Sequence, residues 1–146
     1  MVSEDQKRAL VRQFIESIPH SAVLGLSFVE IGSGEVEMTM PYDKKLVGDP
    51  ATGVIHGGAV STLMDTSCGA AVVCHPESAG VTATLDLRID YMRAATPGQA
   101  ISARATVYHV GRTVAFVRAV AMDADRDNPV ATATGAFTIE NRSAAS

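Results

Sequence analysis

The chain lacks tryptophan, has only two cysteines, and contains no apolar run approaching the ~20 residues that a membrane-spanning helix needs. Six of its first eight residues are polar and no apolar core of a signal peptide follows, so we expect no signal peptide. Neither sign of charge dominates, with 12 basic against 16 acidic residues, and no basic stretch with interleaved aromatics marks a nucleic-acid binder. We therefore expect a cytoplasmic protein that binds neither nucleic acid nor a membrane.

The two cysteines, Cys68 and Cys74, lie six positions apart in one apolar segment. On a helix this spacing is a rise of about 9 Å, which is too long for a disulfide. No histidine pair accompanies them at metal-ligand spacing, so no metal site is expected. We predict buried free thiols. A thiol nucleophile is the alternative, but apolar surroundings disfavour it because they raise a thiol's pKa.

The length of 146 residues and the apolar content of 47% suit one domain, residues 1–146, with its own core. The N-terminal region, 1–20, contains a predicted amphipathic helix over 4–18, capped by Ser3 with Gln6 and ended by Pro19. The apolar residues of this helix that share one face are Leu10, Val11, Phe14, Ile15 and Ile18.

Alternating patterns then predict six strands, separated among others by a turn at 32–34, a loop over 41–55 and a two-residue hairpin turn at Gly111-Arg112. The predicted strands are 23–31, 35–40, 82–91, 100–110, 113–122 and 130–139. In the third of them, Thr84 is expected to share a face with Asp86, Arg88 and Asp90. Residues 141–146 are expected to form a frayed tail.

Residues 59–74 are apolar almost all round, which is typical of a fully buried helix. One buried helix among about six mostly antiparallel strands predicts an α+β fold with the sheet curled round the helix.

Asp65 lies in the middle of this apolar helix. Aspartate is a poor residue for a helix interior, and burying its carboxylate costs several kcal/mol unless it has a partner. A purely structural aspartate would be bonded to a nearby hydroxyl, that of Ser61, Thr62 or Thr66. We favour the hypothesis of a functional carboxylate.

The sequence His56-Gly57-Gly58 stands at the start of the same helix. The first N–H groups of a helix have no internal partner and lie at its positive end, so one exposed there can stabilise an oxyanion. The glycines would let a ligand approach closely. The alternative is that they only make a tight turn into the helix.

Gly57 and Asp65 are about 12 Å apart along the helix axis, whereas attack on a carbonyl needs about 3–3.5 Å. One helix therefore cannot supply both groups to one reaction. Two antiparallel copies of the helix, related by a two-fold axis, could do so, which predicts a dimer.

The His-Gly-Gly sequence, the aspartate seven residues after the second glycine and the segment Thr84–Tyr91 together resemble the PaaI-like branch of the hot-dog-fold thioesterases. The resemblance extends over about residues 20–140. It implies a hot-dog fold, a homodimer that assembles into a homotetramer, and hydrolysis of acyl-CoA without a metal or redox cofactor.

The resemblance also implies roles for five residues. Asp65 matches the catalytic carboxylate, acting as general base or nucleophile. Gly57 matches the oxyanion donor, with Gly58 beside it, and His56 the histidine that shapes the turn. Thr84 matches a hydroxyl position that helps to orient the attacking water.

Many relatives carry an asparagine six or seven residues before the histidine, where this chain has Pro50 and Asp49. Asp49 is expected to replace it as an acceptor near the substrate. Coenzyme A carries phosphates, so Arg93 and Arg112 are candidate ligands for them, with ordinary solvated arginines as the alternative.

Two other functions remain open at this point. One is a hot-dog protein that binds acyl-CoA or an acyl carrier without turnover. The other is a hydratase or dehydratase on the same fold, which is disfavoured because no histidine follows closely after Asp65.

Overall fold

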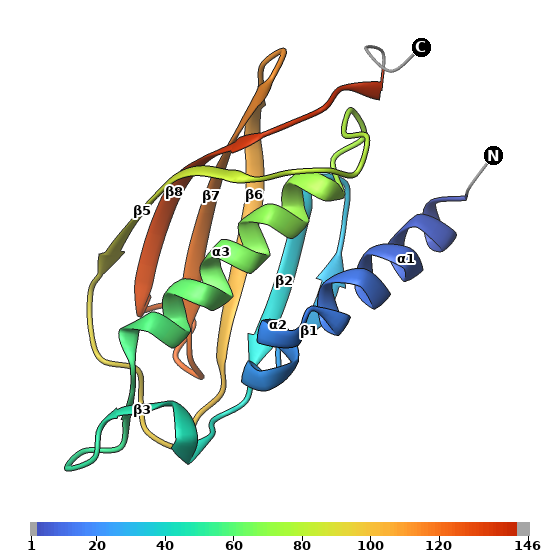
Figure 1. Cartoon of the computed structure of the whole chain (residues 1–146). Coiled ribbons are helices and arrows are strands. Elements are labelled where there is room, and N and C mark those ends of the chain that lie inside the picture. Colours follow the sequence, from blue (N-terminus) through green and yellow to red (C-terminus); the bar gives the residue numbers. More distant parts are fainter. Residues whose placement is uncertain (1–2, 143–146) are drawn as a thin grey trace.

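In the computed structural model, which describes residues 3–142, one long helix lies along one face of a six-stranded sheet (Figure 1). The helices are α1 (Glu4–Ser17), α2 (Pro19–Leu24) and α3 (Gly57–Val73), with a 3-10 turn at Lys44–Leu46. The sheet strands are β1 (Ser27–Ile31), β2 (Glu35–Met40), β5 (Thr84–Tyr91), β6 (Ile101–Val110), β7 (Val114–Met122) and β8 (Ala131–Thr138). The short strands β3 (Val47–Asp49) and β4 (Val54–Ile55) form a separate ladder within the predicted loop 41–55.

The sheet order is β1-β2-β6-β7-β8-β5, and every neighbouring pair is antiparallel. The strands after α3 lie together, and β5 and β1 form the two edges of the sheet. The predicted α+β hot-dog architecture is therefore confirmed.

The central helix is buried because its inward side chains meet small residues on the strands. Leu63, Met64 and Cys68 have no exposed surface. Small side chains under a helix let its backbone come close to the sheet, so the core is closely packed. The fully or almost fully buried alanines of the strands are Ala103, Ala105, Ala115, Ala119, Ala121, Ala131 and Ala133.

The N-terminal helix begins as predicted, with a capping box between Ser3 and Gln6. Its apolar face is only partly covered, however. Val11 and Ile15 are buried, whereas Leu10 and Phe14 are 59% and 62% exposed.

The segment after this helix differs from the prediction of one strand over 23–31. The first helix ends before Pro19, as predicted, but Pro19 also begins a second helix, α2, since a proline at the first helical position loses no hydrogen bond. Gly25 then closes α2 in the left-handed conformation, with φ of 71°, and β1 starts only at Ser27.

Two smaller predictions also need correction. The hairpin loop between β6 and β7 comprises Arg112 and Thr113, one residue later than predicted, because Gly111 is hydrogen-bonded to Val114. The predicted frayed tail is ordered at its start, where Asn141 pairs with Ser78. The rest of that tail, 143–146, lies outside the described residues.

Within residues 3–142, no helix is long and apolar enough to cross a membrane. Cys68 and Cys74 are both free and buried, as predicted.

Candidate active site

The carboxylate of Asp65 has a partner from another element of the fold. The Thr84 hydroxyl, at the start of β5, donates to Asp65 Oδ1 at 2.8 Å. The hydroxyls of Ser61 and Thr62 instead donate to the Gly58 carbonyl. The structural alternative, in which a hydroxyl of the same helix satisfies Asp65, is therefore wrong for these two residues.

Thr84 reaches Asp65 because of an irregularity in β5. The register against β8 shifts between Thr84 and Asp86, which is a β-bulge. Beyond the shift, Leu87 and Ile89 line the same cavity as Thr84, while Asp86 lies on the other face. The prediction that Thr84 shares a face with Asp86, Arg88 and Asp90 is wrong, since strict alternation does not hold through a bulge.

Asp65 and Thr84 lie in the wall of a cavity of about 820 Å³ that runs over the solvent-facing side of α3. One border is the C-terminal half of α1, and the other is the chain leading into β5. The lining is mainly apolar and includes Phe14, Ile15, Ile18, Ala70, Val73, Val81, Leu87, Ile89 and Phe137. A carboxylate in such a wall is positioned to act on an uncharged group held against it.

The start of α3 holds one unused donor. His56 is the N-cap, and its Nδ1 accepts from the Gly58 N–H at 2.8 Å. The Gly57 carbonyl accepts from the Tyr91 hydroxyl at 2.8 Å. Within residues 3–142, the Gly57 N–H has no acceptor. Gly57 therefore presents a backbone N–H without an acceptor among the described residues, whereas Gly58 already donates to His56.

The position of His56 is fixed from the β3 side. Its N–H donates to the Leu46 carbonyl at 2.9 Å. Gly48 lies so close that a Cβ there would stand 2.8 Å from the Cα of His56. This contact requires glycine at position 48 and explains how His56 is held at the entry to α3.

Asp49 is occupied within its own turn. Its carboxylate accepts from the Ala51 N–H at 3.1 Å and from the Thr52 hydroxyl at 2.8 Å. These bonds brace the turn between β3 and β4. The structure does not bring Asp49 into the cavity that contains Asp65.

Arg93 is neither a free ligand for phosphate nor a solvated arginine, which corrects both predictions. It makes a bidentate pair with Asp123, with both N···O distances 2.7 Å, and its Nε donates to the Asn128 carbonyl. The Asp123 side chain is only 1% exposed. The Arg93 guanidinium holds the pKa of Asp123 well below its usual range, so the pair locks the chain after β5 to the β7–β8 loop.

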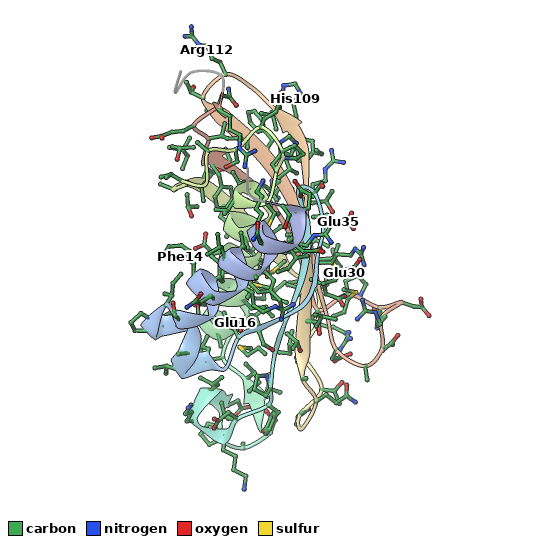
Figure 2. The ribbon with its side chains drawn as sticks, turned by 90° about the vertical axis from the view of Figure 1, so that its right-hand side faces the viewer. Phe14, Glu16, Glu30, Glu35, His109 and Arg112 are labelled. Atoms are coloured by element: carbon green, nitrogen blue, oxygen red, sulfur yellow. The ribbon has the colours of Figure 1, made fainter. Side chains whose placement is uncertain are left out.

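Arg112 lies at the tip of the β6–β7 hairpin, near His109 at the far end of the sheet (Figure 2). Its carbonyl accepts from the Asn141 side chain. It is not among the residues that line the Asp65 cavity, so the structure does not bring it together with the predicted catalytic residues.

Two residues of this region were missed from the sequence. His20, on α2, lines the Asp65 cavity, with its Nε2 3.4 Å from the Thr62 hydroxyl. Tyr91 ties the end of β5 to the start of α3. Alternation indicated a strand residue at Tyr91 but gave no partner, and nothing in the pattern predicted α2.

A cysteine nucleophile is not supported. Burial and the neighbouring charge of Asp65 raise the pKa of Cys68 to about 12, and burial raises that of Cys74 to about 11. Neither thiol forms a significant fraction of thiolate near neutral pH.

Comparison with known proteins decides the family. A family model described as the thioesterase superfamily matches residues 52–130, which include the start of α3, Asp65 and Thr84. This chain belongs to the thioesterase superfamily. Among similar proteins, a putative esterase of Halobacterium salinarum is 38% identical over 75% of this chain and 74% of its own. The human acyl-coenzyme A thioesterase 13 is 31% identical over 75% of this chain and 76% of its own.

Solved structures agree with the hot-dog assignment of this thioesterase-superfamily member. A Pseudomonas aeruginosa protein is 38% identical, with a TM-score of 0.80 over 90% of this chain and 98% of that one. The PaaI protein of Escherichia coli is 18% identical, with a TM-score of 0.81 over 93% of this chain and 94% of that one, and shows the shared fold. The PaaI-like resemblance is confirmed.

Proposed function

We propose that this thioesterase-superfamily protein hydrolyses acyl-CoA to a free acid and coenzyme A, with Asp65 as general base or nucleophile. The observation that carries the proposal is the Asp65–Thr84 hydrogen bond in the wall of an apolar cavity. The names of relatives, such as the human acyl-coenzyme A thioesterase 13, support the substrate class.

A complete site in this proposal uses two subunits. Asp65 and Thr84 lie together at the start of β5, whereas Gly57 and Tyr91 lie together at its end. β5 is an edge strand, so it can pair with another copy of itself. Antiparallel pairing centred on Arg88 places residues of the same face opposite each other and, across the bulge at Leu85, brings Thr84 opposite the partner's Tyr91. Each half-site then faces the other half-site of the partner subunit.

This pairing supports the proposed homodimer, and two such dimers would make the proposed homotetramer. It places the thioester carbonyl oxygen on the Gly57 N–H of the partner subunit, with its carbon near Asp65. Because His56 occupies the Gly58 N–H, Gly57 is the donor that the helix start offers to an oxyanion.

The general-base route runs as follows. Asp65 takes a proton from a water molecule as the water oxygen attacks the thioester carbon, and negative charge develops on the carbonyl oxygen. The tetrahedral intermediate then breaks its C–S bond. The departing thiolate takes the proton held by Asp65, which gives the carboxylic acid and coenzyme A.

In the nucleophilic route, Asp65 attacks the carbonyl carbon directly and expels the thiolate. The resulting mixed anhydride is then hydrolysed by water, which restores the Asp65 carboxylate. In both routes Thr84 fixes one carboxylate oxygen, Oδ1, so that Oδ2 faces the substrate or water.

The test is release of coenzyme A, followed with a thiol reagent, from aliphatic and aromatic acyl-CoAs. Asp65→Asn should lower kcat by about 10²- to 10⁴-fold, since it removes the proton acceptor but keeps the side-chain shape. Thr84→Ala should cause a smaller loss that Thr84→Ser restores, because serine keeps the hydroxyl.

Circular dichroism and direct binding of acyl-CoA serve as controls for folding and substrate affinity. Full activity in Asp65→Asn would refute the mechanism. Tight acyl-CoA binding by the wild type without any release of coenzyme A would instead support the non-catalytic binding protein. Incorporation of ¹⁸O from labelled water into Asp65 during a single turnover distinguishes the nucleophilic route from the general-base route.

A further inference from the structure

The cavity that contains Asp65 continues beyond the reacting groups. A second cavity, of about 500 Å³, lies between the N-terminal half of α1 and the end of α3. The two cavities share Phe14, Val73 and Gly80 in their walls. Since α1 and α3 run side by side in opposite directions, the two cavities lie end to end along α3, with Phe14 between them, and together define a groove (Figure 1).

The chemistry of the groove changes along its length. Its first part carries the polar side chains Asp65, Thr84 and His20. Towards the end of α3 the wall becomes apolar, with Ala70, Val73, Val81 and Phe14. Lys7, Glu4 and Arg142 appear only at the far end of the second cavity. A ligand with a reactive polar head and an apolar tail matches this order of side chains.

A glycine on α3 leaves space in the floor of the groove next to Asp65. Gly69 lies one helical turn after Asp65, and a Cβ there would find its nearest neighbour, Thr82 Cγ2, at 3.8 Å. Glycine is therefore not required by the backbone packing at this position. Its effect is to leave open space in the groove directly beyond the carboxylate.

Phe14 stands at the junction of the two cavities. It is 62% exposed although it is apolar, and it projects on the helix side of the molecule, away from the sheet (Figure 2). Nearby Leu10 and Val81 are also exposed, by 59% and 58%. Clustered exposed apolar side chains of this kind indicate a binding surface rather than ordinary solvent-facing residues.

We propose that this groove binds the acyl chain of the substrate as an extended aliphatic tail, and that Phe14 closes its first part. The inference rests on the proposed thioesterase function and specifies the substrate class as unbranched medium-chain acyl-CoA. The groove is continuous with Asp65, which is why we assign it to the substrate rather than to a separate partner.

The length of the first cavity sets the preferred chain. From Asp65 to Val73 is eight helical residues, or about 12 Å. With C–C bonds of about 1.52 Å and angles of about 111°, an extended alkyl chain advances about 1.25 Å per bond, so about nine C–C bonds fit between the carboxylate and Phe14. The decanoyl group is the natural match.

The test is kcat/KM for acetyl-, hexanoyl-, decanoyl-, hexadecanoyl- and phenylacetyl-CoA. Each buried methylene should raise kcat/KM about threefold to fourfold up to decanoyl, after which the increase should stop. Gly69→Leu fills the groove, so the ratio of decanoyl to acetyl kcat/KM should fall at least about tenfold, the equivalent of two or more buried methylenes. Phe14→Ala joins the two cavities and should raise the hexadecanoyl to decanoyl ratio.

The control is Val29→Ala on β1, which removes a side chain of similar exposure, 55%, outside both cavities and should leave all ratios unchanged. Circular dichroism and light scattering check the fold and the oligomeric state of every variant. Should Gly69→Leu fail to fold, Phe14→Ala still tests the proposal.

Equal kcat/KM for acetyl and decanoyl, a preference for phenylacetyl, or ratios that neither variant changes would overturn the groove assignment while leaving the thioesterase function intact. A change of oligomeric state in Phe14→Ala or Gly69→Leu, with unaltered chain-length ratios, would show that a second subunit covers the groove and would also overturn the assignment. Absence of hydrolysis for every thioester would instead refute the proposed function.

Discussion

The two edges of the sheet are treated differently. At β1, α1 covers the edge with two side chains, since Glu16 accepts from the Phe28 N–H at 3.0 Å and Arg12 donates to the Phe28 carbonyl at 3.2 Å. At β5 no helix of the described chain plays that part, and Leu85 and Tyr91 are 57% and 52% exposed. One edge is closed within the chain, and the other is left open.

The open edge is the one that bears the candidate site. Asp65 is bonded to the first residue of β5, and Gly57 to the last. Edge strands that natural proteins do not protect are available for pairing with another chain. The contrast therefore favours β5 as the dimer edge and β1 as a closed boundary of each subunit.

The largest effect is expected where β5 is anchored to the sheet. Arg93→Ala leaves the Asp123 carboxylate, 1% exposed, without its cation, and should lower the free energy of unfolding by about 3 kcal/mol. Urea denaturation measures the loss. Arg8→Ala is the matched control, since its ion pair with Asp5 is exposed and should contribute less than about 1 kcal/mol.

The same pair gives a pH dependence of known sign. The folded pKa of Asp123 is lowered, so its contribution to stability is present above the unfolded pKa of about 3.9 and is lost as the pH falls below it. Wild-type stability should therefore decrease below about pH 4 more steeply than that of Arg93→Ala. Parallel curves for the two proteins would contradict this role of Arg93.

The next effect tests the open edge itself. In the proposed pairing Leu85 is the exposed bulge residue next to Asp86, which lies opposite the partner's Asp90. Leu85→Asp therefore removes an apolar side chain and adds a carboxylate to an acidic part of the interface twice in each dimer. We expect the dimer to weaken by about 2 kcal/mol, or about 30-fold in Kd, measured by analytical ultracentrifugation. Thioesterase activity should fall in parallel at low protein concentration.

The matched control for this change is Val29→Asp on β1, where the wild-type side chain is 55% exposed. It should alter neither Kd nor activity, because that edge is already covered. Equal weakening by both substitutions, or by neither, would remove the basis for the comparison of the two edges.

The smallest effect concerns the closed edge. Glu16→Ala removes the acceptor of the Phe28 N–H and should lower the free energy of unfolding by about 1 kcal/mol, without changing the dimer Kd. Thermal unfolding and ultracentrifugation together check both statements. Glu16→Gln, which keeps an acceptor oxygen, should recover most of the loss.

Much of this architecture could be predicted from periodicity. The apolar run over 59–74 predicts a buried helix, and the alternating patterns predict which face of each strand is buried. The sheet, the central helix and the position of Asp65 within that helix could therefore be predicted. The burial of the two free thiols could also be predicted, because both cysteines lie in one continuous apolar run of the sequence.

The errors arose where a long-range contact overrides a local pattern. Thr84 faces Asp65 only because of a bulge against β8, which strict alternation along β5 cannot show. Arg93 resembles any surface arginine in the sequence, since its partner Asp123 is thirty residues away. Pro19 is compatible with both the end and the beginning of a helix, and here it stands at both, since α1 ends just before it and α2 begins with it.

One face of the N-terminal helix α1 contacts the edge of the sheet and another face borders the groove, so a movement of the helix changes both contacts. Arg12 and Glu16 seal a strand edge, while Phe14, between them in the chain, borders the groove. Under the proposed groove assignment, substitutions that change the chain-length preference by shifting α1 would also move Arg12 and Glu16 away from β1. Selectivity can therefore diverge among homologues more safely by exchanging single side chains on the groove face than by moving or trimming the segment.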